Sequence, residues 1–130
     1  MKKVLSFALI LCFVLTLSAL CLTGCALFKS LSIDEAKANL ENAGYEVTLM
    51  SGHDYIESDQ NPYPFLMEHE LDGYLYAVKG EDVVYLYFFT SVDNASDNYD
   101  FMNEHSDLKR GQSNAVIYMA TAQAKSDAGL

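Results

Sequence analysis

Two groups of histidine and carboxylate side chains are the candidates for metal chemistry in this 130-residue sequence. They are His53-Asp54 and Glu68-His69-Glu70. Imidazole and carboxylate groups bind divalent metals when folding brings them to one point. The spacing matches no known ligand motif, and adjacent residues of an extended segment point to opposite sides. We therefore interpret both groups as solvated charged residues. We expect no resident metal or cofactor, and we keep a small-ligand or metal-ion carrier as the alternative function.

The other residues whose side chains could take part in catalysis lack the arrangement that catalysis needs. Ser113, His105 and Asp107 are merely near one another in sequence, and no nucleophile lies in a recognisable elbow. No glycine-rich phosphate-binding loop is present. A run of acidic residues lacks the glycine and the alternating spacing of a calcium loop, and an exposed helical face explains it better. The run comprises Asp93, Asp97, Asp100, Glu104 and Asp107. We predict that the protein is not an enzyme.

Tyrosines of a predicted hairpin form the best candidate for a binding surface. Segments 71–78 and 83–90 are predicted strands, and a two-residue turn at Gly80-Glu81 would give Gly80 the positive φ of a type II′ turn. Counting back from that turn sorts the side chains onto two faces, because cross-strand pairs share a face. The tyrosine face carries Tyr74, Tyr76, Tyr85 and Tyr87, to which we add Tyr118 of a later strand. The aliphatic face carries Leu75, Ala77, Val84, Leu86 and Phe88.

A partly solvent-exposed tyrosine surface is suited to binding, since the ring is apolar and the hydroxyl is polar. Such a face can take a peptide, a glycan or a partner protein. The alternative is that the aperiodic region 51–67, or a second copy of the domain, covers it.

The remaining predicted elements surround this hairpin. A helix over 33–43 begins with the capping box Ser32–Glu35 and ends before Gly44. A strand over 45–50 follows, and a second helix runs from Ser91 to about His105. A fourth strand over 114–120 places Ala115, Ile117 and Met119 on one face and Val116, Tyr118 and Ala120 on the other. A short helix over 121–128 ends the chain.

The element order α-β-β-β-α-β predicts an α+β fold. We expect a mostly antiparallel four-stranded sheet with both main helices on one face. This order loosely resembles ferredoxin-like and cystatin-like sandwiches without matching either strand order.

The first 24 residues have the features of an export leader. Met1-Lys2-Lys3 is followed by Val4–Leu22, which is 19 residues without a charge. A positive start, an apolar run and small residues after it describe a secretory signal peptide. The run is nearly long enough to span a bilayer, so an uncleaved transmembrane anchor is the alternative.

The stretch Leu22-Thr23-Gly24-Cys25 closely resembles the lipobox of bacterial lipoprotein precursors. The resemblance implies that a diacylglyceryl group joins the Cys25 thiol, that a signal peptidase cuts between Gly24 and Cys25, and that acylation of the new amine follows. Several acyl chains anchor stably where one is marginal. The resemblance thus divides the chain into a signal peptide (1–24), an anchor with a short spacer (25–31) and one domain (32–130). That domain resembles small bacterial lipoproteins of no specific family.

Charge and cysteine content limit what this domain does. Eight basic and 18 acidic residues give −10, and loss of Lys2 and Lys3 would give six minus 18, or −12. Such a charge excludes nucleic acid as a partner and opposes contact with anionic lipid. Because Cys12 and Cys21 lie in the leader, no internal disulfide is expected.

We therefore expect a lipid-anchored protein facing outward from a cell membrane, or from an outer membrane where one exists. Its domain would act as a binding or accessory module for a membrane-proximal partner protein or envelope component, with self-association as a further option.

Overall fold

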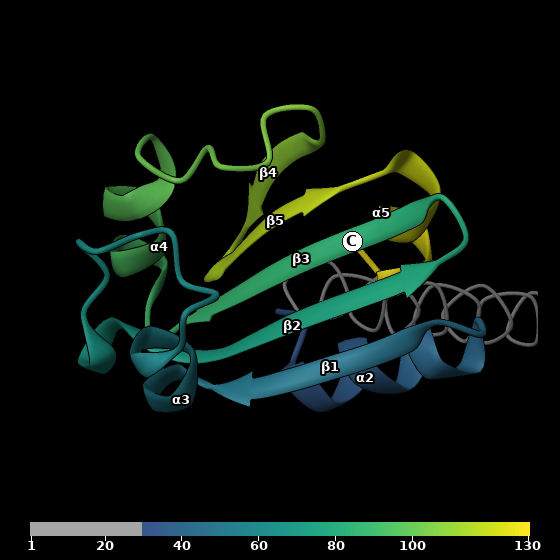
Figure 1. Cartoon of the computed structure of the whole chain (residues 1–130), viewed down its shortest axis with the longest axis horizontal. Coiled ribbons are helices and arrows are strands. Elements are labelled where there is room, and N and C mark those ends of the chain that lie inside the picture. Colours follow the sequence, from purple (N-terminus) through teal and green to yellow (C-terminus); the bar gives the residue numbers. More distant parts are fainter. Residues whose placement is uncertain (1–29) are drawn as a thin grey trace, which may run out of the picture.

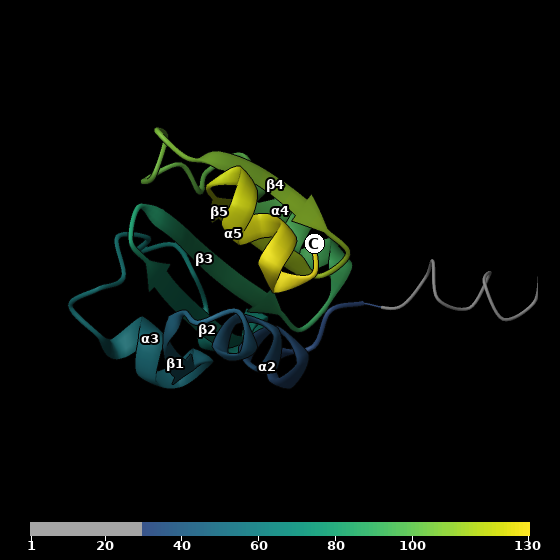
Figure 2. The same cartoon turned by 90° about the vertical axis from the view of Figure 1, so that its right-hand side faces the viewer.

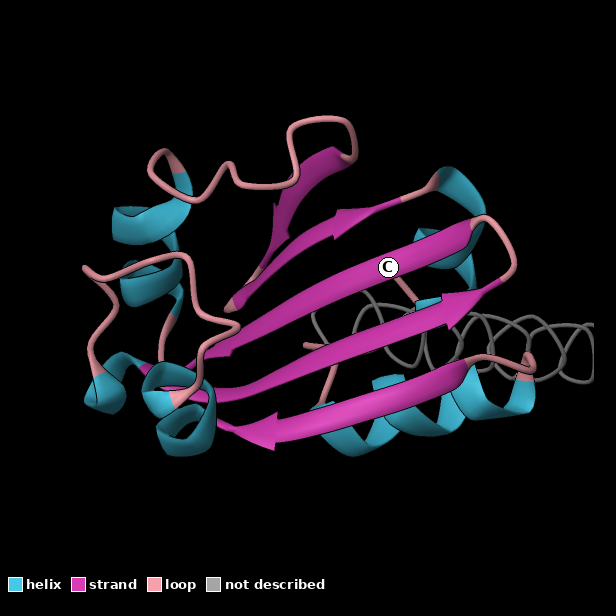
Figure 3. Ribbon diagram, viewed as in Figure 1, coloured by secondary structure: helices cyan, strands magenta, loops and turns pink. Residues whose placement is uncertain are grey.

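An antiparallel five-stranded sheet forms the centre of the domain in the computed structural model, which describes residues 30–130 (Figure 1). The strands lie in the order β1-β2-β3-β5-β4, and every neighbouring pair is antiparallel. Their bounds are Glu46–Ser51 (β1), Leu71–Lys79 (β2), Asp82–Phe89 (β3), Lys109–Ser113 (β4) and Val116–Ala120 (β5). The helices are Ile33–Asn42 (α2), Gly52–Glu57 (α3), Val92–Tyr99 (α4) and Ala122–Ala128 (α5), with a 3-10 turn at Glu68–Glu70 (η1) (Figure 3). The predicted α+β fold with an antiparallel sheet is confirmed.

The β2–β3 hairpin has the predicted register. Tyr76 pairs with Tyr85 and Tyr74 with Tyr87, while Lys79 and Asp82 close the two-residue turn. Gly80 takes a φ of +61°, which a side chain would disfavour. The turn thus places the tyrosines on one face of the hairpin and the aliphatic residues on the other.

The prediction of four strands is wrong because β4 was missed. Its sequence, Lys-Arg-Gly-Gln-Ser, has no alternating apolar residues, since β4 is an edge strand that pairs only with β5. A tight turn joins the two strands, with Ser113 paired to Val116 and Asn114 at a φ of +52°. Asparagine tolerates this left-handed conformation better than most residues. The segment 109–111 is therefore part of the sheet.

The prediction that both main helices share one face is also wrong. Ala36 and Leu40 of α2 pack on the aliphatic face together with Ala124 and Ala128 of α5. Ala95 of α4 instead belongs to the core on the tyrosine face. Small alanines let α5 approach α2 closely, so this pair fills the space on the aliphatic face. Figure 2 shows α2 and α5 on the same side of β3.

The region 51–67 contains a short helix that lies against the start of β2. The Ser51 hydroxyl accepts a hydrogen bond from the Asp54 backbone at 3.1 Å, which begins α3. A Cβ on Gly52 would lie 1.8 Å from the Leu71 carbonyl oxygen, so only glycine permits this approach. In Figure 1, α3 lies at the end of the sheet opposite the β2–β3 turn. The region is therefore structured and packed on the sheet.

The second predicted helix is shorter than expected, because α4 ends at Tyr99 and not near His105. Its sequence, Val-Asp-Asn-Ala-Ser-Asp-Asn-Tyr, is rich in residues that compete with helical hydrogen bonds. The chain then continues without regular structure, held by buried Met102 and half-buried Leu108. This segment, 100–108, lies over the tyrosine face.

Candidate functional site

The tyrosine face is divided into a covered half and an open half. Tyr74 and Tyr87 are buried, with Tyr87 only 1 % exposed, beneath aromatic rings of the region 51–67. Tyr55 of α3 stacks on Tyr74 with ring centroids 4.2 Å apart and meets Tyr87 edge-on at 5.6 Å. Tyr63 meets Tyr87 edge-on at 5.8 Å. Half of the candidate surface is therefore hydrophobic core.

Burial keeps the tyrosines of this covered half neutral, and the hydroxyls of Tyr55 and Tyr63 are hydrogen-bonded. Tyr55 Oη donates to Tyr87 Oη at 3.3 Å, and the Glu104 backbone donates to Tyr63 Oη at 3.2 Å. Burial raises the pKa of Tyr55 to about 12. Burial also raises the pKa values of Tyr74 and Tyr87. The covered tyrosines thus form a fixed, uncharged floor beside the open half.

The open half is a small aromatic groove. Tyr76 and Tyr85 are half-buried, their ring centroids 4.9 Å apart and their planes tilted by 34°. His105 stacks on Tyr85 with centroids 3.8 Å apart and an angle of 13°. The hollow has a volume of about 280 Å³, slightly below the size typical of small-molecule sites. We call it the aromatic groove; its lining residues are Gln60, Tyr74, Tyr76, Tyr85, Tyr87 and His105.

No lysine or arginine lines the aromatic groove, and its surroundings are acidic. Burial raises the pKa of Tyr85, and the nearby Tyr76 hydroxyl and Asp107 carboxylate raise it further. Arg110 is aligned with Tyr85 across β5, because Met119 pairs with both residues. Arg110 is already engaged, because its Nη1 donates to the Tyr99 and Met102 carbonyls, each at 2.9 Å.

Tyr118 does not belong to the tyrosine face, which corrects the sequence-based assignment. It pairs with Leu86 and packs in the core of the aliphatic face, where Lys125 of α5 lies 5.1 Å from the centre of its ring. The alternation along this strand was predicted correctly. Tyr85 pairs with Met119, so the residues that alternate with Tyr118, and not Tyr118 itself, share the face of the tyrosines. That pairing is a long-range contact, which the alternation within one strand does not reveal.

Sequence reasoning missed two residues of the aromatic groove, Gln60 and His105. Gln60 lies in a segment without periodicity, and His105 was placed at the end of a predicted helix that in the structure ends at Tyr99, so no local pattern indicated where either side chain goes. His105 and Asp107 approach Tyr85, but Ser113 pairs with Val116 at the other end of β4. The structure therefore does not assemble Ser113, His105 and Asp107 into a catalytic triad.

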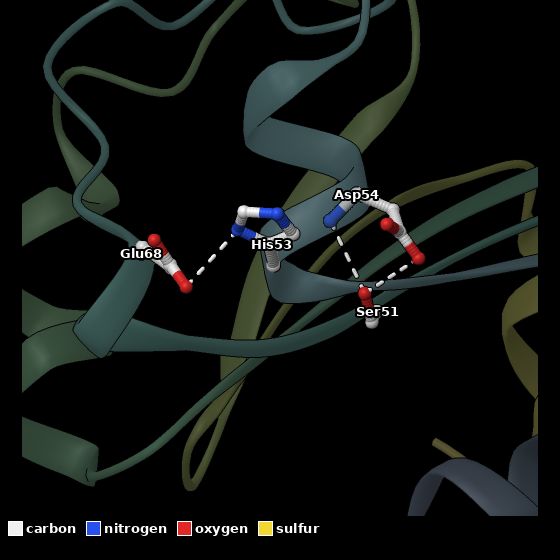
Figure 4. Close-up of polar contacts among 4 residues, drawn as sticks. All are labelled: Ser51, His53, Asp54 and Glu68. Carbon is white, nitrogen blue, oxygen red and sulfur yellow. Dashed lines mark hydrogen bonds and ion pairs between the residues drawn. The ribbon is translucent and has the colours of Figure 1, made fainter.

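The histidine–carboxylate groups are split between separate contacts (Figure 4). His53 Nδ1 lies 3.0 Å from Glu68 Oε1, with the side chains 60 % and 64 % exposed, and this bond raises the pKa of His53. Asp54 turns instead to the Ser51 hydroxyl, which donates to it at 2.8 Å. Glu70 Oε2 accepts from the Met67 backbone at 3.4 Å. Within residues 30–130, no three His, Cys, Asp or Glu side chains gather to hold a metal ion.

Two other surface features lie outside the aromatic groove. A shallow hollow of about 380 Å³ lies beside the start of α2, between Ile33 and Phe88. An apolar patch joins the region 51–67 to segment 100–108, where exposed Phe65 and Phe101 meet edge-on at 5.8 Å and Phe101 is 65 % exposed. Neither feature combines rings, hydroxyls and an imidazole as the aromatic groove does.

Comparison with protein-family models, with curated proteins and with solved structures gives no match to this chain. In the described residues 30–130, no helix has both the length and the apolar character needed to cross a membrane. The predicted leader and Cys25 lie outside the described residues. The groove and the sequence pattern before the domain are therefore the features that bear on function.

Proposed function

We propose that this protein is an outward-facing, lipid-anchored lipoprotein whose domain binds a membrane-proximal partner through the aromatic groove. The observation that carries the proposal is the open half of the tyrosine face, where Tyr76, Tyr85 and His105 stay accessible beside a fixed aromatic floor. Aromatic side chains around a hollow are typical of binding sites, since their rings contribute contact area with little loss of conformational entropy.

The sequence pattern supports an anchor close to the domain. The Leu22-Thr23-Gly24-Cys25 stretch directly precedes a short spacer, and α2 begins at Ile33. A fully extended chain over residues 26–32 reaches at most about 25 Å. A domain tethered at Cys25 would therefore meet partners near the membrane surface. Its negative charge would disfavour lying flat on anionic lipid.

Mass spectrometry of the membrane-extracted protein tests the anchor. The expected chain begins at Cys25 and carries a diacylglyceryl group on the thiol, because the lipobox directs both modifications. A Cys25→Ser variant controls for the thiol and should stay unlipidated and uncleaved. An intact leader, or an unmodified Cys25 in the wild-type protein, would contradict the anchor.

Crosslinking in intact cells tests the groove. We expect the amount of partner crosslinked to a Tyr76→Ser/Tyr85→Ser variant to fall at least about tenfold, as is typical when two central aromatic contacts are removed. Both side chains are half-buried. The loss of both rings should therefore cost no more than about 4 kcal/mol, which is below the stability of roughly 5–15 kcal/mol of a typical domain.

A Phe65→Ser/Phe101→Ser variant is the matched control, because it removes two exposed rings outside the groove. It should retain the partner. Equal loss in both double variants would assign the interaction to general surface hydrophobicity and contradict the role of the groove. Loss of the far-UV circular dichroism signal in the tyrosine variant would show that these rings are core residues.

A further inference from the structure

We infer that the group entering the aromatic groove is a cation, namely a lysine or arginine side chain on a partner protein. This inference rests on the proposed function, since it specifies the chemistry of the same site. Three observations carry it: the ring chemistry of the lining, the way the chain uses its other tyrosines, and the charge of the domain.

The lining is suited to a positive charge. Two of its lining residues, Tyr76 and Tyr85, are tyrosines that stay partly exposed, and tyrosine ring faces attract cations within about 6 Å. Tyr76 and Tyr85 lie side by side with centroids 4.9 Å apart, and His105 covers one face of Tyr85, so a cation entering the hollow would meet the part of this ring pair that stays uncovered. The tyrosine hydroxyls and the Gln60 amide oxygen supply acceptors for ammonium or guanidinium protons. Because no lysine or arginine lines the groove, an anionic ligand would find only the His105 imidazole as a partner that can carry a positive charge.

The same chain already places its own cations on tyrosine rings. Lys79 lies over Tyr45 at 5.7 Å, Arg110 over Tyr99 at 4.4 Å and Lys125 over Tyr118 at 5.1 Å. These are the cation–ring contacts of residues 30–130, and none involves Tyr76 or Tyr85. The groove therefore lacks the kind of contact that three other tyrosines of the domain have.

The charge of the domain favours the same occupant. Residues 30–130 contain five basic and 18 acidic side chains, which gives five minus 18, or −13. A field of this sign attracts a cationic partner and repels an anionic one. It also opposes a second copy of the same chain, because the two copies would carry equal charges. Asp107 lies close enough to Tyr85 to influence its hydroxyl, so the negative field extends to the groove.

A peptide titration on the full mature protein in uncharged detergent tests the inference. The probe is a blocked Gly-Lys-Gly-Lys-Gly peptide, and the matched control carries norleucine in place of lysine, which keeps most of the hydrocarbon and removes the charge. We expect shifts of the Tyr76, Tyr85 and His105 ring signals in NMR with millimolar affinity. The norleucine peptide should bind at least about tenfold more weakly. Equal binding of both peptides would overturn the inference.

Variants separate ring contact from general attraction. Tyr76→Leu and Tyr85→Leu should each weaken lysine-peptide binding about tenfold, whereas Tyr76→Phe and Tyr85→Phe should keep it within about twofold, because phenylalanine retains the ring face. Phe101→Leu, outside the groove, should change nothing. If the leucine variants bind as the wild type does, the attraction is nonspecific and the inference fails. The norleucine peptide, measured on the wild-type protein, keeps the test valid should a leucine variant fold poorly.

Three further outcomes distinguish this inference from a glycan site and from the proposed function. If a chitin oligosaccharide shifts the same ring signals and the lysine peptide does not, the groove binds a glycan, and the inference that it binds a cation is overturned. Partner crosslinking that depends on Tyr76 and Tyr85, without lysine-peptide binding, would keep the proposed function and overturn the inference. Lysine-peptide binding at the groove, with partner crosslinking unaffected by the Tyr76→Ser/Tyr85→Ser change, would support the inference and contradict the proposed function.

Discussion

Replacing Tyr87 with alanine is expected to lower the free energy of unfolding by about 3–5 kcal/mol, the usual cost of deleting a large buried aromatic ring. Tyr87 is 1 % exposed and contacts the rings of Tyr55, Tyr63 and Tyr74. Its removal would leave a cavity between β3 and the region 51–67. Urea unfolding followed by far-UV circular dichroism measures the effect.

Two variants serve as controls for this prediction. Tyr87→Phe keeps the ring and removes only the hydroxyl that accepts from Tyr55, so it should cost about 1 kcal/mol. Tyr85→Ala removes a half-buried ring from the same strand and should cost about 1–2 kcal/mol. If the Tyr85 and Tyr87 alanine variants were equally destabilised, the division of the tyrosine face into covered and open halves would be wrong.

Above about pH 10, the domain is expected to lose stability steeply and to unfold cooperatively, because unfolded tyrosines ionise near that pH. Burial raises the pKa of Tyr55 to about 12 and raises those of Tyr74 and Tyr87 as well. These groups keep their protons in the folded state at pH values where the unfolded chain has lost them. The stability they contribute is therefore complete below pH 10 and is lost as the pH rises through the folded-state values.

Each such tyrosine contributes a slope of up to about 1.4 kcal/mol per pH unit, so several together suffice to unfold a small domain. Tyrosinate absorbance and circular dichroism, recorded on the same samples, should change together. Tyr55→Phe removes one of these groups and should reduce the slope of the free energy of unfolding against pH by about the contribution of one tyrosine. Gradual ionisation with no loss of circular dichroism would show that the covered tyrosines are accessible to solvent.

Local chemistry accounts for the parts of this fold that could be predicted. The β2–β3 register follows from Gly80 in a two-residue turn and from strict alternation on both sides of it. The start of α2 follows from Ser32, whose hydroxyl accepts from the Glu35 backbone at 3.2 Å. Both depend on neighbours within a few residues, and such interactions are encoded directly in the sequence.

The early end of α4 at Tyr99 is set by its own sequence, whereas the other errors concern contacts between distant segments. β4 has no apolar alternation and exists because β5 provides backbone partners for it. The side of the sheet that α4 covers depends on competition with α5, whose alanines fit beside α2. Tyr118 was assigned to the wrong face because the alternation within a strand sorts its residues onto two faces but does not say which of these faces carries Tyr85.

The sequence by itself determined that four tyrosines share one face of a hairpin, and it contains the pattern that predicts the Cys25 anchor. Only the tertiary structure decided what these tyrosines do. Tyr55 and Tyr63 pack over Tyr74 and Tyr87 and convert that half into core, while segment 100–108 brings His105 onto Tyr85 and leaves Tyr76 beside an open hollow. The physical reason is that burial is a property of the whole packed molecule, whereas the alternation that sorts side chains onto faces is a property of neighbouring residues.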